Sequence, residues 1–148
     1  MTPLFEIKSF KGLSVTELYQ ILKLRSEVFI IEQNCIYQDI DDKDEKALHL
    51  LGVYNNKIVA YCRLFNAGDY FKNASIGRVV INKEYRDKKW GHLLMQNAMK
   101  GIFCNYGEQE ITISAQLYLK GFYESHGFEQ ISETYLEDGI PHIEMLRK

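Results

Sequence analysis

The chain contains 148 residues, 46% of them hydrophobic and 26% charged, with 18 Lys and Arg, 20 Asp and Glu, and a net charge of −2. This composition is typical of one globular domain, expected over residues 1–148, and argues against disorder, a coiled coil or a globally basic nucleic-acid binder. No apolar run reaches the roughly 20 residues of a membrane span, and the N-terminus lacks a signal-peptide core. We therefore expect a cytoplasmic protein without membrane or nucleic-acid partners.

Cysteine and histidine usage argues against a disulfide framework and a metal site. The cysteines are odd in number and widely spaced, at Cys35, Cys62 and Cys104. Such spacing, without a CxxC pair, is typical of a reducing compartment. The histidines, which show no HExxH spacing, are His49, His92, His126 and His142. No bound metal ion is expected.

A strand and a long helix are predicted first. Residues 5–10 alternate between polar and apolar side chains, as in a strand. Ser14 and Glu17 form the pattern of a capping box, and the apolar spacing that follows predicts an amphipathic helix over 15–32. The acidic segment 34–46 predicts a loop or a short irregular helix.

Three strands are predicted in the middle of the chain. Apolar runs over 47–54 and 57–65 flank the pair Asn55-Asn56, a pattern that predicts a hairpin. After a loop, residues 74–81 are predicted to form a buried strand.

Helices and strands then alternate. Apolar residues within 95–103 share one helical face, and Gly107 predicts the end of that helix. A short strand is predicted at 110–115, followed by a short helix at 117–126 that ends at Gly127.

Two last strands, at about 128–136 and 142–147, are predicted to flank the turn signal at 138–141 (DGIP). The resulting order is β-α-loop-β-β-β-α-β-α-β-β, with hairpins on both sides of an alternating centre. This order predicts an α/β chain with a mixed sheet covered by helices, rather than a doubly wound parallel sheet.

Residues 79–94 combine a buried strand, a basic turn and the start of a helix. A helix N-terminus offers unpaired N–H groups that suit a phosphate, and Arg86, Lys88 and Lys89 add positive charge there. Gly91 would allow the backbone to approach a phosphate oxygen closely. The alternative is a basic surface without a ligand, because such clusters are common on surfaces.

Two motifs resemble those of GNAT-type N-acetyltransferases. Residues 86–91 (RDKKWG) resemble the pyrophosphate motif Gln/Arg-x-x-Gly-x-Gly/Ala, with Lys89 in place of the first glycine. Residues 116–128 resemble Asn-x-x-Ala-x-x-Phe-Tyr-Glu-x-x-Gly-Phe, with Gln116 and Leu119 in place of Asn and Ala. The residues that match the second motif are Phe122, Tyr123, Glu124, Gly127 and Phe128.

Further segments are similar to the ElaA-like subgroup of that family, namely 25–44, His49-Leu50, 77–80 and 137–143. The resemblance implies the GNAT acyl-CoA N-acyltransferase fold, with a mostly antiparallel central sheet flanked by helices. It also implies transfer of the acetyl group of acetyl-CoA to a primary amine of a small-molecule or peptide acceptor, by direct attack in a ternary complex. Acetyl-CoA and the amine are the implied partners, and a homodimer is left open.

The resemblance also implies roles for individual residues. Those expected to bind acetyl-CoA are Val79, Val80, Ile81, Arg86, Asp87, Lys88, Lys89, Trp90, Gly91, His92 and Gln116. A backbone N–H around 79–81 is expected to donate to the developing oxyanion. Tyr123 is expected to protonate the departing thiolate, because a phenol pKa of about 10 suits a thiol of about 8.5. The alternative for Tyr123 is packing alone.

The base that takes a proton from the amine is left open. Many family members carry Glu just before the Arg-Val pair of the fourth strand, where this chain has Gly77. The candidates, acting directly or through water, are Glu32, Asp39, His49 and His142. His49 has the most suitable ordinary pKa, about 6.5, and a hydrogen-bonded structural histidine is its alternative. Glu32 could instead line the acceptor site.

Arg25 and the acidic loop 39–45 each have competing interpretations. Arg25 lies on the apolar stripe of its helix, so a buried structural pair with Glu32 or Asp44 is favoured over a contact with an acceptor carboxylate or a cofactor phosphate. The loop is either a solvated surface or an electrostatic funnel for a cationic amine, with calcium binding a remote third interpretation.

Three competing functions are weighed against direct transfer. A covalent route through Cys35 is less favoured, because no His lies near it in the sequence. A CoA-binding regulator or sensor without catalysis is supported only by Gly77 and Lys89. An RNA-binding module would need a basic aromatic face that the sequence lacks. The sequence therefore favours an enzyme.

Overall fold

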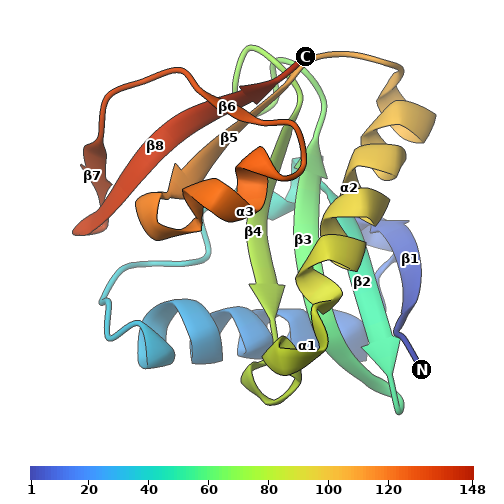
Figure 1. Cartoon of the computed structure of the whole chain (residues 1–148). Helices are drawn as coiled ribbons and strands as arrows, with labels where there is room; N and C mark the ends of the chain where they lie inside the picture. Colours follow the sequence, from blue (N-terminus) through green and yellow to red (C-terminus); the bar gives the residue numbers. More distant parts are fainter.

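The computed structural model describes all of residues 1–148 and arranges them around two antiparallel sheets (Figure 1). The strands of the first sheet, in spatial order, are β1 (Leu4–Ser9), β2 (Leu48–Tyr54), β3 (Lys57–Phe65) and β4 (Ser75–Ile81). The second sheet is centred on β8 (Ile140–Arg147), which pairs with β5 (Ile111–Gln116), β6 (Glu129–Gln130) and β7 (Tyr135–Glu137). The predicted fold class is confirmed.

The helical segments lie where the periodicity predicts them. They are α1 (Val15–Arg25), its π-helical continuation η2 (Ser26–Glu32), α2 (Trp90–Tyr106) and α3 (Lys120–Glu124). The remaining 3-10 turns are η1 (Phe10–Gly12), η3 (Asp44–Lys46), η4 (Lys83–Lys88) and η5 (Leu117–Leu119). The capping box at the start of α1 is confirmed, because Ser14 Oγ accepts from the Glu17 N–H at 3.0 Å and Glu17 Oε1 from the Ser14 N–H at 2.8 Å. None of the helices combines the length and hydropathy that crossing a membrane requires.

Helices cover both faces of the first sheet (Figure 1). On one face α2 buries Leu94 and Ala98 in the same apolar cluster as Leu64 of β3. On the other face α1 buries Ile21 in a cluster with Leu51 of β2. Because the inner strands are covered on both sides, they are apolar nearly throughout rather than alternating.

The two hairpins turn at residues that tolerate positive φ. Asn55 and Asn56 have φ of 50° and 59° between β2 and β3, which confirms the predicted hairpin. Asp138 and Gly139 have φ of 53° and 78° between β7 and β8. Asn, Asp and Gly are the residues that adopt this conformation most readily, so the sequence itself determines both turns.

The strand predicted over 128–136 is broken into β6 and β7. Between them Ser132 Oγ accepts a hydrogen bond from the Glu144 N–H at 2.8 Å, so a side chain replaces the strand backbone as the partner of β8. Ile140 and Pro141, predicted within the turn, belong to β8. Short polar side chains compete with the sheet for backbone hydrogen bonds, which explains the interruption.

The two sheets meet at β4 and β5, which run parallel to each other at one point and then diverge. They are joined by one bridge between Ala74 and Ile111, next to a 2.8 Å hydrogen bond from the Thr112 N–H to the Ala74 carbonyl. Figure 1 shows the two strands diverging from that point. Their facing backbone edges are therefore not paired with each other beyond the bridge.

A β-bulge lies in the diverging part of β4. Tyr61 of β3 pairs with Val80 and Arg63 pairs with Gly77, so Arg78 and Val79 together oppose Cys62. Arg78 has a φ of 50°, which is uncommon for a residue with a side chain. Bulges of this kind redirect side chains and end regular pairing, and they are frequent beside active sites.

Candidate active site

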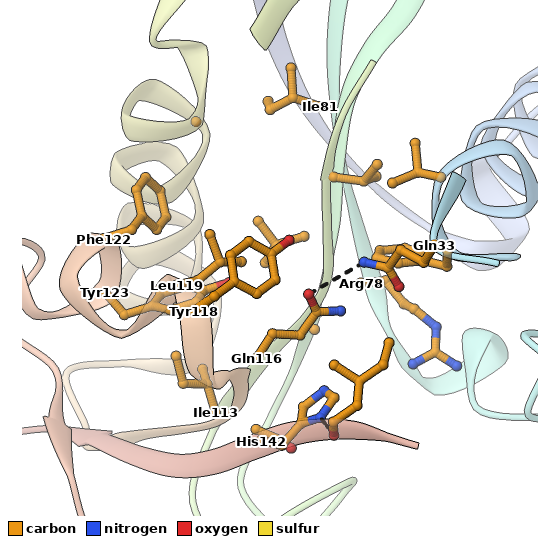
Figure 2. A pocket seen from close by; sticks show the side chains of 18 of the residues that line it. Gln33, Arg78, Ile81, Ile113, Gln116, Tyr118, Leu119, Phe122, Tyr123 and His142 are labelled. Atoms are coloured by element: carbon orange, nitrogen blue, oxygen red, sulfur yellow. Dashed lines mark hydrogen bonds between the residues drawn. The ribbon is translucent and has the colours of Figure 1, made fainter. Parts of the chain in front are cut away.

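A cavity of about 540 Å³ occupies the space between the diverging strands β4 and β5. Its walls come from η2, β4, the start of α2, β5, η5, α3 and the β7–β8 turn. Figure 2 shows Tyr118, Tyr123 and Phe122 on one side, Gln33 and Arg78 on the other, and His142 below Gln116. Segments far apart in the sequence thus contribute side chains to one site.

We call the part of the cavity beside α2 the coenzyme end; it is lined by Arg86, Lys89, Gly91 and His92. The N–H groups of Trp90 and Gly91 at the start of α2 have no partner within the helix, whereas the His92 N–H donates to the Lys89 carbonyl at 3.3 Å. Together with the basic side chains they favour an anion at this end.

Lys89 precedes α2 in the left-handed conformation, with φ of 60° and ψ of 25°. Glycine adopts this conformation without steric cost, whereas a residue with a Cβ loses about 1–2 kcal/mol. The GNAT-type motif has glycine at this position. The substitution therefore keeps the backbone path that a glycine would give and adds a cation to the cavity wall.

Eight of the expected coenzyme-binding residues line the cavity and three do not. Those that line it are Val79, Val80, Ile81, Arg86, Lys89, Gly91, His92 and Gln116. Asp87 and Lys88 are exposed on η4 outside the lining. Trp90 is buried, with its ring centroid 5.0 Å from that of Tyr54 and 5.3 Å from that of Tyr85. Trp90 therefore anchors the start of α2 rather than facing the cavity.

Glu32 and Arg86 form an ion pair at the cavity wall. Arg86 Nη1 donates to Glu32 Oε2 and Nη2 donates to Oε1 at 2.8 Å, a bidentate pair, while Arg86 Nε donates to the Ile81 carbonyl at 3.1 Å. The hydrogen bonds from Arg86 lower the pKa of the Glu32 carboxyl. The pairing joins η2 to the turn before α2.

Tyr123 of α3 is 6% exposed and lines the cavity. Phe122 and Phe128 lie at right angles to its ring, with centroids at 5.1 Å and 6.0 Å. Burial raises the pKa of the Tyr123 phenol well above its ordinary value. The hydroxyl is therefore protonated at neutral pH, and it is a weaker acid than an exposed phenol.

His49 lies on β2 outside the residues that line the cavity. Its Nδ1 is 2.6 Å from the Tyr61 hydroxyl and its Nε2 is 2.9 Å from the Asp44 carbonyl oxygen. Because a carbonyl can only accept, Nε2 carries the proton and Nδ1 accepts from Tyr61. Burial lowers the pKa of His49. These contacts favour a hydrogen-bonded structural role for His49 over the role of base.

Arg25 is fully buried and forms ion pairs with the acidic loop. Its Nε donates to Asp39 Oδ2 at 2.8 Å and its Nη1 donates to Asp44 Oδ1 at 2.8 Å. The structural interpretation of Arg25 is confirmed for Asp44, whereas the suggested partner Glu32 pairs with Arg86 instead.

Two more arginines complete this cluster, which we call the Arg–Asp network. Arg63 Nη1 donates to Asp44 Oδ1 at 2.9 Å and to Asp41 Oδ1 at 2.8 Å. Arg78 Nε donates to Asp39 Oδ1 at 2.8 Å. Three of the acidic side chains of loop 39–45 are thus paired with arginines, so neither a solvated loop nor a free acidic funnel describes these residues.

Several cavity residues were not singled out from the sequence. Gln33 Nε2 donates to Gln116 Oε1 at 3.3 Å across the cavity (Figure 2). Arg78, Ser114 and Glu137 also line the cavity. Glu137 falls within a segment similar to the ElaA-like subgroup, and that similarity was the one sequence signal that could have pointed to it.

Cys35 is half-buried and lies outside the cavity lining. Its Sγ donates to the Asp138 carbonyl at 2.9 Å. This contact fastens the segment after η2 to the β7–β8 turn, so the structure gives Cys35 a packing partner rather than a place at the cavity wall. No group of three or more His, Cys, Asp or Glu side chains is arranged to hold a metal ion.

Comparison with known proteins shows matches along nearly the whole chain. The family described as "Acetyltransferase (GNAT) domain" matches residues 13–148. The protein ElaA of Escherichia coli is 41% identical over 138 residues, which cover 92% of this chain and 90% of ElaA. The crystal structure of E. coli ElaA superposes with a TM-score of 0.92 at 38% identity and covers all of both chains.

A second solved structure, described as an acyl-CoA N-acyltransferase from Pseudomonas aeruginosa, superposes with a TM-score of 0.91 at 36% identity. The alignment covers 98% of this chain and 99% of that one. An aminoglycoside 6′-N-acetyltransferase complexed with coenzyme A has the same fold, with a TM-score of 0.71 at 15% identity and 96% of each chain covered.

Proposed function

We propose that this chain, which belongs to the GNAT acetyltransferase family, transfers the acetyl group of acetyl-CoA to a primary amine of a small molecule or peptide. One observation carries the proposal: a single cavity extends from the cationic N-terminus of α2 to the buried hydroxyl-bearing ring of Tyr123. Such a cavity can bind a diphosphate at one end and a thioester at the other.

The coenzyme end supplies the binding energy for the diphosphate. The unpaired N–H groups at the start of α2 and the side chains of Arg86, Lys89 and His92 converge there. Arg86 would exchange Glu32 for a phosphate oxygen, since both are anionic acceptors of its bidentate N–H groups. The exchange keeps the guanidinium paired in both states.

The backbone of β4 would stabilise the reacting carbonyl. Beyond the Ala74–Ile111 bridge the edge of β4 that faces β5 has no strand partner, and residues 79–81 line the cavity. A fixed backbone N–H in this position donates to the oxygen that becomes negatively charged during attack. The bulge at Arg78 and Val79 interrupts the regular pairing of this stretch with β3.

Tyr123 would give its proton to the sulfur as the C–S bond breaks. Its phenol is protonated at neutral pH because burial disfavours the phenolate. The raised pKa makes the phenol a weaker acid than a thiol of about 8.5, so the transfer depends on the hydroxyl lying beside the sulfur as negative charge develops there.

Thiol release from acetyl-CoA with a panel of primary amines tests the proposal, with mass spectrometry of the product to identify an acetylated amine. We expect thiol release that depends on the amine. A protein that binds acetyl-CoA but releases no thiol with any amine would instead be the CoA-binding sensor. Lys89 no longer supports that alternative, because it keeps the backbone conformation of the missing glycine.

A further inference from the structure

The amine acceptor must lose a proton before it can attack, because an alkylamine is largely an ammonium ion at neutral pH. The inference below concerns the group that accepts this proton and the class of acceptor it selects, and it rests on the proposed function.

Three of the four candidate bases have other partners or lie elsewhere. Glu32 is held by both terminal nitrogens of Arg86. Asp39 accepts from Arg25 Nε and from Arg78 Nε, each at 2.8 Å. His49 lies outside the cavity lining.

The position at which many GNAT members carry Glu provides no general base in this chain. Gly77 lines the cavity, and a Cβ added there would lie 3.9 Å from Arg63 Nε. A cation therefore stands beside this position, and β4 supplies no carboxylate of its own.

His142 remains, and its hydrogen bonds leave one ring nitrogen able to accept a proton. Its Nδ1 lies 2.7 Å from the Ile140 carbonyl oxygen, which can only accept, so Nδ1 carries the hydrogen. Neutral His142 then bears its lone pair on Nε2. Figure 2 shows the imidazole below Gln116, at the cavity.

Glu137 of β7 lies beside this nitrogen. Its Oε2 is 3.4 Å from His142 Nε2, close enough to stabilise an imidazolium. Its Oε1 accepts from Ser114 Oγ at 3.1 Å, and that hydroxyl is 2.6 Å from the Tyr135 hydroxyl. The carboxylate is thus held in place from β5 and β7.

The groups around His142 are acidic or neutral. Its neighbours on adjacent strands are Tyr135 and Glu137 of β7 and Gln116 of β5, and Glu144 lies two residues further along β8. Asp138 and Tyr118 line the same cavity. Arg78 across the cavity is paired with Asp39 at 2.8 Å. We call this region, lined by Ser114, Glu137, Asp138 and His142, the acceptor end.

We propose that the acceptor end binds a primary ammonium ion and that His142 Nε2 takes its proton, with Glu137 as the carboxylate that holds the resulting imidazolium. The acceptor that fits is an alkylamine whose amine-bearing end has no carboxylate, because Glu137 and Asp138 would repel one. Lys89, the lysine that lines the cavity, lies at the coenzyme end and not at the acceptor end.

The protons and bonds of this step balance. The ammonium gives one proton to His142 Nε2, and the free amine forms the N–C bond as the C–S bond of acetyl-CoA breaks. The sulfur takes a proton from Tyr123, and the amide nitrogen loses its second proton to restore the phenol through water. His142 returns its proton to solvent, which leaves an acetylated amine, free CoA and one released proton.

Kinetics with two amines of different basicity test the role of His142. Butylamine is an ammonium ion at pH 7, whereas 2,2,2-trifluoroethylamine is largely neutral there and needs no base. We expect His142→Gln to lower kcat/KM for butylamine by about 100-fold or more at pH 7, with the KM for acetyl-CoA unchanged. The loss of kcat/KM becomes smaller as the pH rises, because more of the butylamine is then neutral. For trifluoroethylamine we expect a loss of kcat/KM of only a few-fold. Equal losses with both amines at every pH would overturn the assignment.

Calorimetry on CoA-saturated protein tests the ammonium site without turnover. Butylammonium is expected to bind the wild-type protein and to bind Glu137→Gln several-fold more weakly. The matched control is Glu129→Gln, an exposed acid on β6 outside the cavity lining, which should bind as the wild type does. Equal binding to all three proteins, or no binding to the wild type, would overturn the acceptor class. Absence of thiol release despite ammonium binding would contradict the proposed function instead.

Discussion

At the scale of single residues, Tyr123 illustrates how packing sets the protonation state of a side chain. It is buried among Phe122 and Phe128, and the same burial keeps its hydroxyl protonated. The sequence motif singles out this tyrosine among ten. Phe122 and Phe128 belong to the same motif, but the sequence could not show that their rings pack against Tyr123.

Tyr123→Phe separates the two contributions. The substitution keeps the ring and its contacts, so we expect the fold and the KM for acetyl-CoA to be retained. Loss of the proton donor should lower kcat by about 100-fold or more. Steady-state kinetics with acetyl-CoA check this result, and equal turnover by the two proteins would show that Tyr123 only packs.

His49→Gln is expected to affect stability and leave the pH profile unchanged. The substitution disturbs hydrogen bonds to the Tyr61 hydroxyl and the Asp44 carbonyl in a fully buried position. Leaving a buried polar partner unsatisfied costs about 1–3 kcal/mol. Urea denaturation measures this loss. A change in the acidic limb of the kcat/KM profile, without a loss of stability, would restore His49 as a candidate base.

At the scale of elements, the Arg–Asp network explains why an acidic loop lies against the sheet. Asp39, Asp41 and Asp44 are paired with arginines from α1, β3 and β4. The sequence revealed the charges of the loop and the unusual place of Arg25 on an apolar stripe. It did not reveal that Arg63 and Arg78 are the other partners, because those pairings depend on the register of β3 and β4.

Asp44→Asn is expected to lower the free energy of unfolding by about 3–5 kcal/mol, because it leaves Arg25 and Arg63 buried with one carboxylate fewer. Chemical denaturation at pH 7 measures the change. The matched control is Asp42→Asn, an exposed residue of the same loop with φ of 62°, which should change the stability little. Equal effects of the two substitutions would contradict the network.

The same network predicts how stability depends on pH. Burial opposes ionisation of Asp41 and Asp44, but hydrogen bonds and charge from Arg63, and for Asp44 also from Arg25, hold the pKa of each carboxyl below its ordinary value. A lowered folded pKa stabilises the fold above about pH 4, and this contribution is lost as the pH falls further. Wild-type protein should therefore lose stability below pH 4 more steeply than Asp44→Asn, as denaturation curves at several pH values would show.

The turn before α2 separates two basic residues that the sequence analysis both assigned to coenzyme binding. Arg86 lines the cavity, whereas Lys88 is exposed outside it. We expect Arg86→Ala to weaken CoA binding several-fold and Lys88→Ala to have a smaller effect that disappears at high salt. Calorimetric titrations of CoA at two salt concentrations measure both. A larger effect of Lys88→Ala at high salt would contradict the placement of Arg86.

At the scale of the whole molecule, local patterns predicted most elements but not how the two sheets meet. The hairpin at Asn55 and Asn56, the capping box at Ser14 and the helix before Gly107 follow from short-range sequence signals. The separation of β4 from β5 depends on long-range packing of α2 and α3 against them. The cavity itself was therefore outside what the sequence alone could predict.

The central claim is that this cavity between β4 and β5 binds acetyl-CoA through the start of α2. Calorimetric titration of acetyl-CoA into the wild-type protein and into Gly91→Val tests it directly, since a branched side chain at this cavity-lining position would occupy space beside the helix N-terminus. The account predicts one binding site in the wild type and at least a tenfold weaker affinity in the variant, a loss of about 1.4 kcal/mol. No heat with the wild type, or equal affinity of the two proteins, would contradict it.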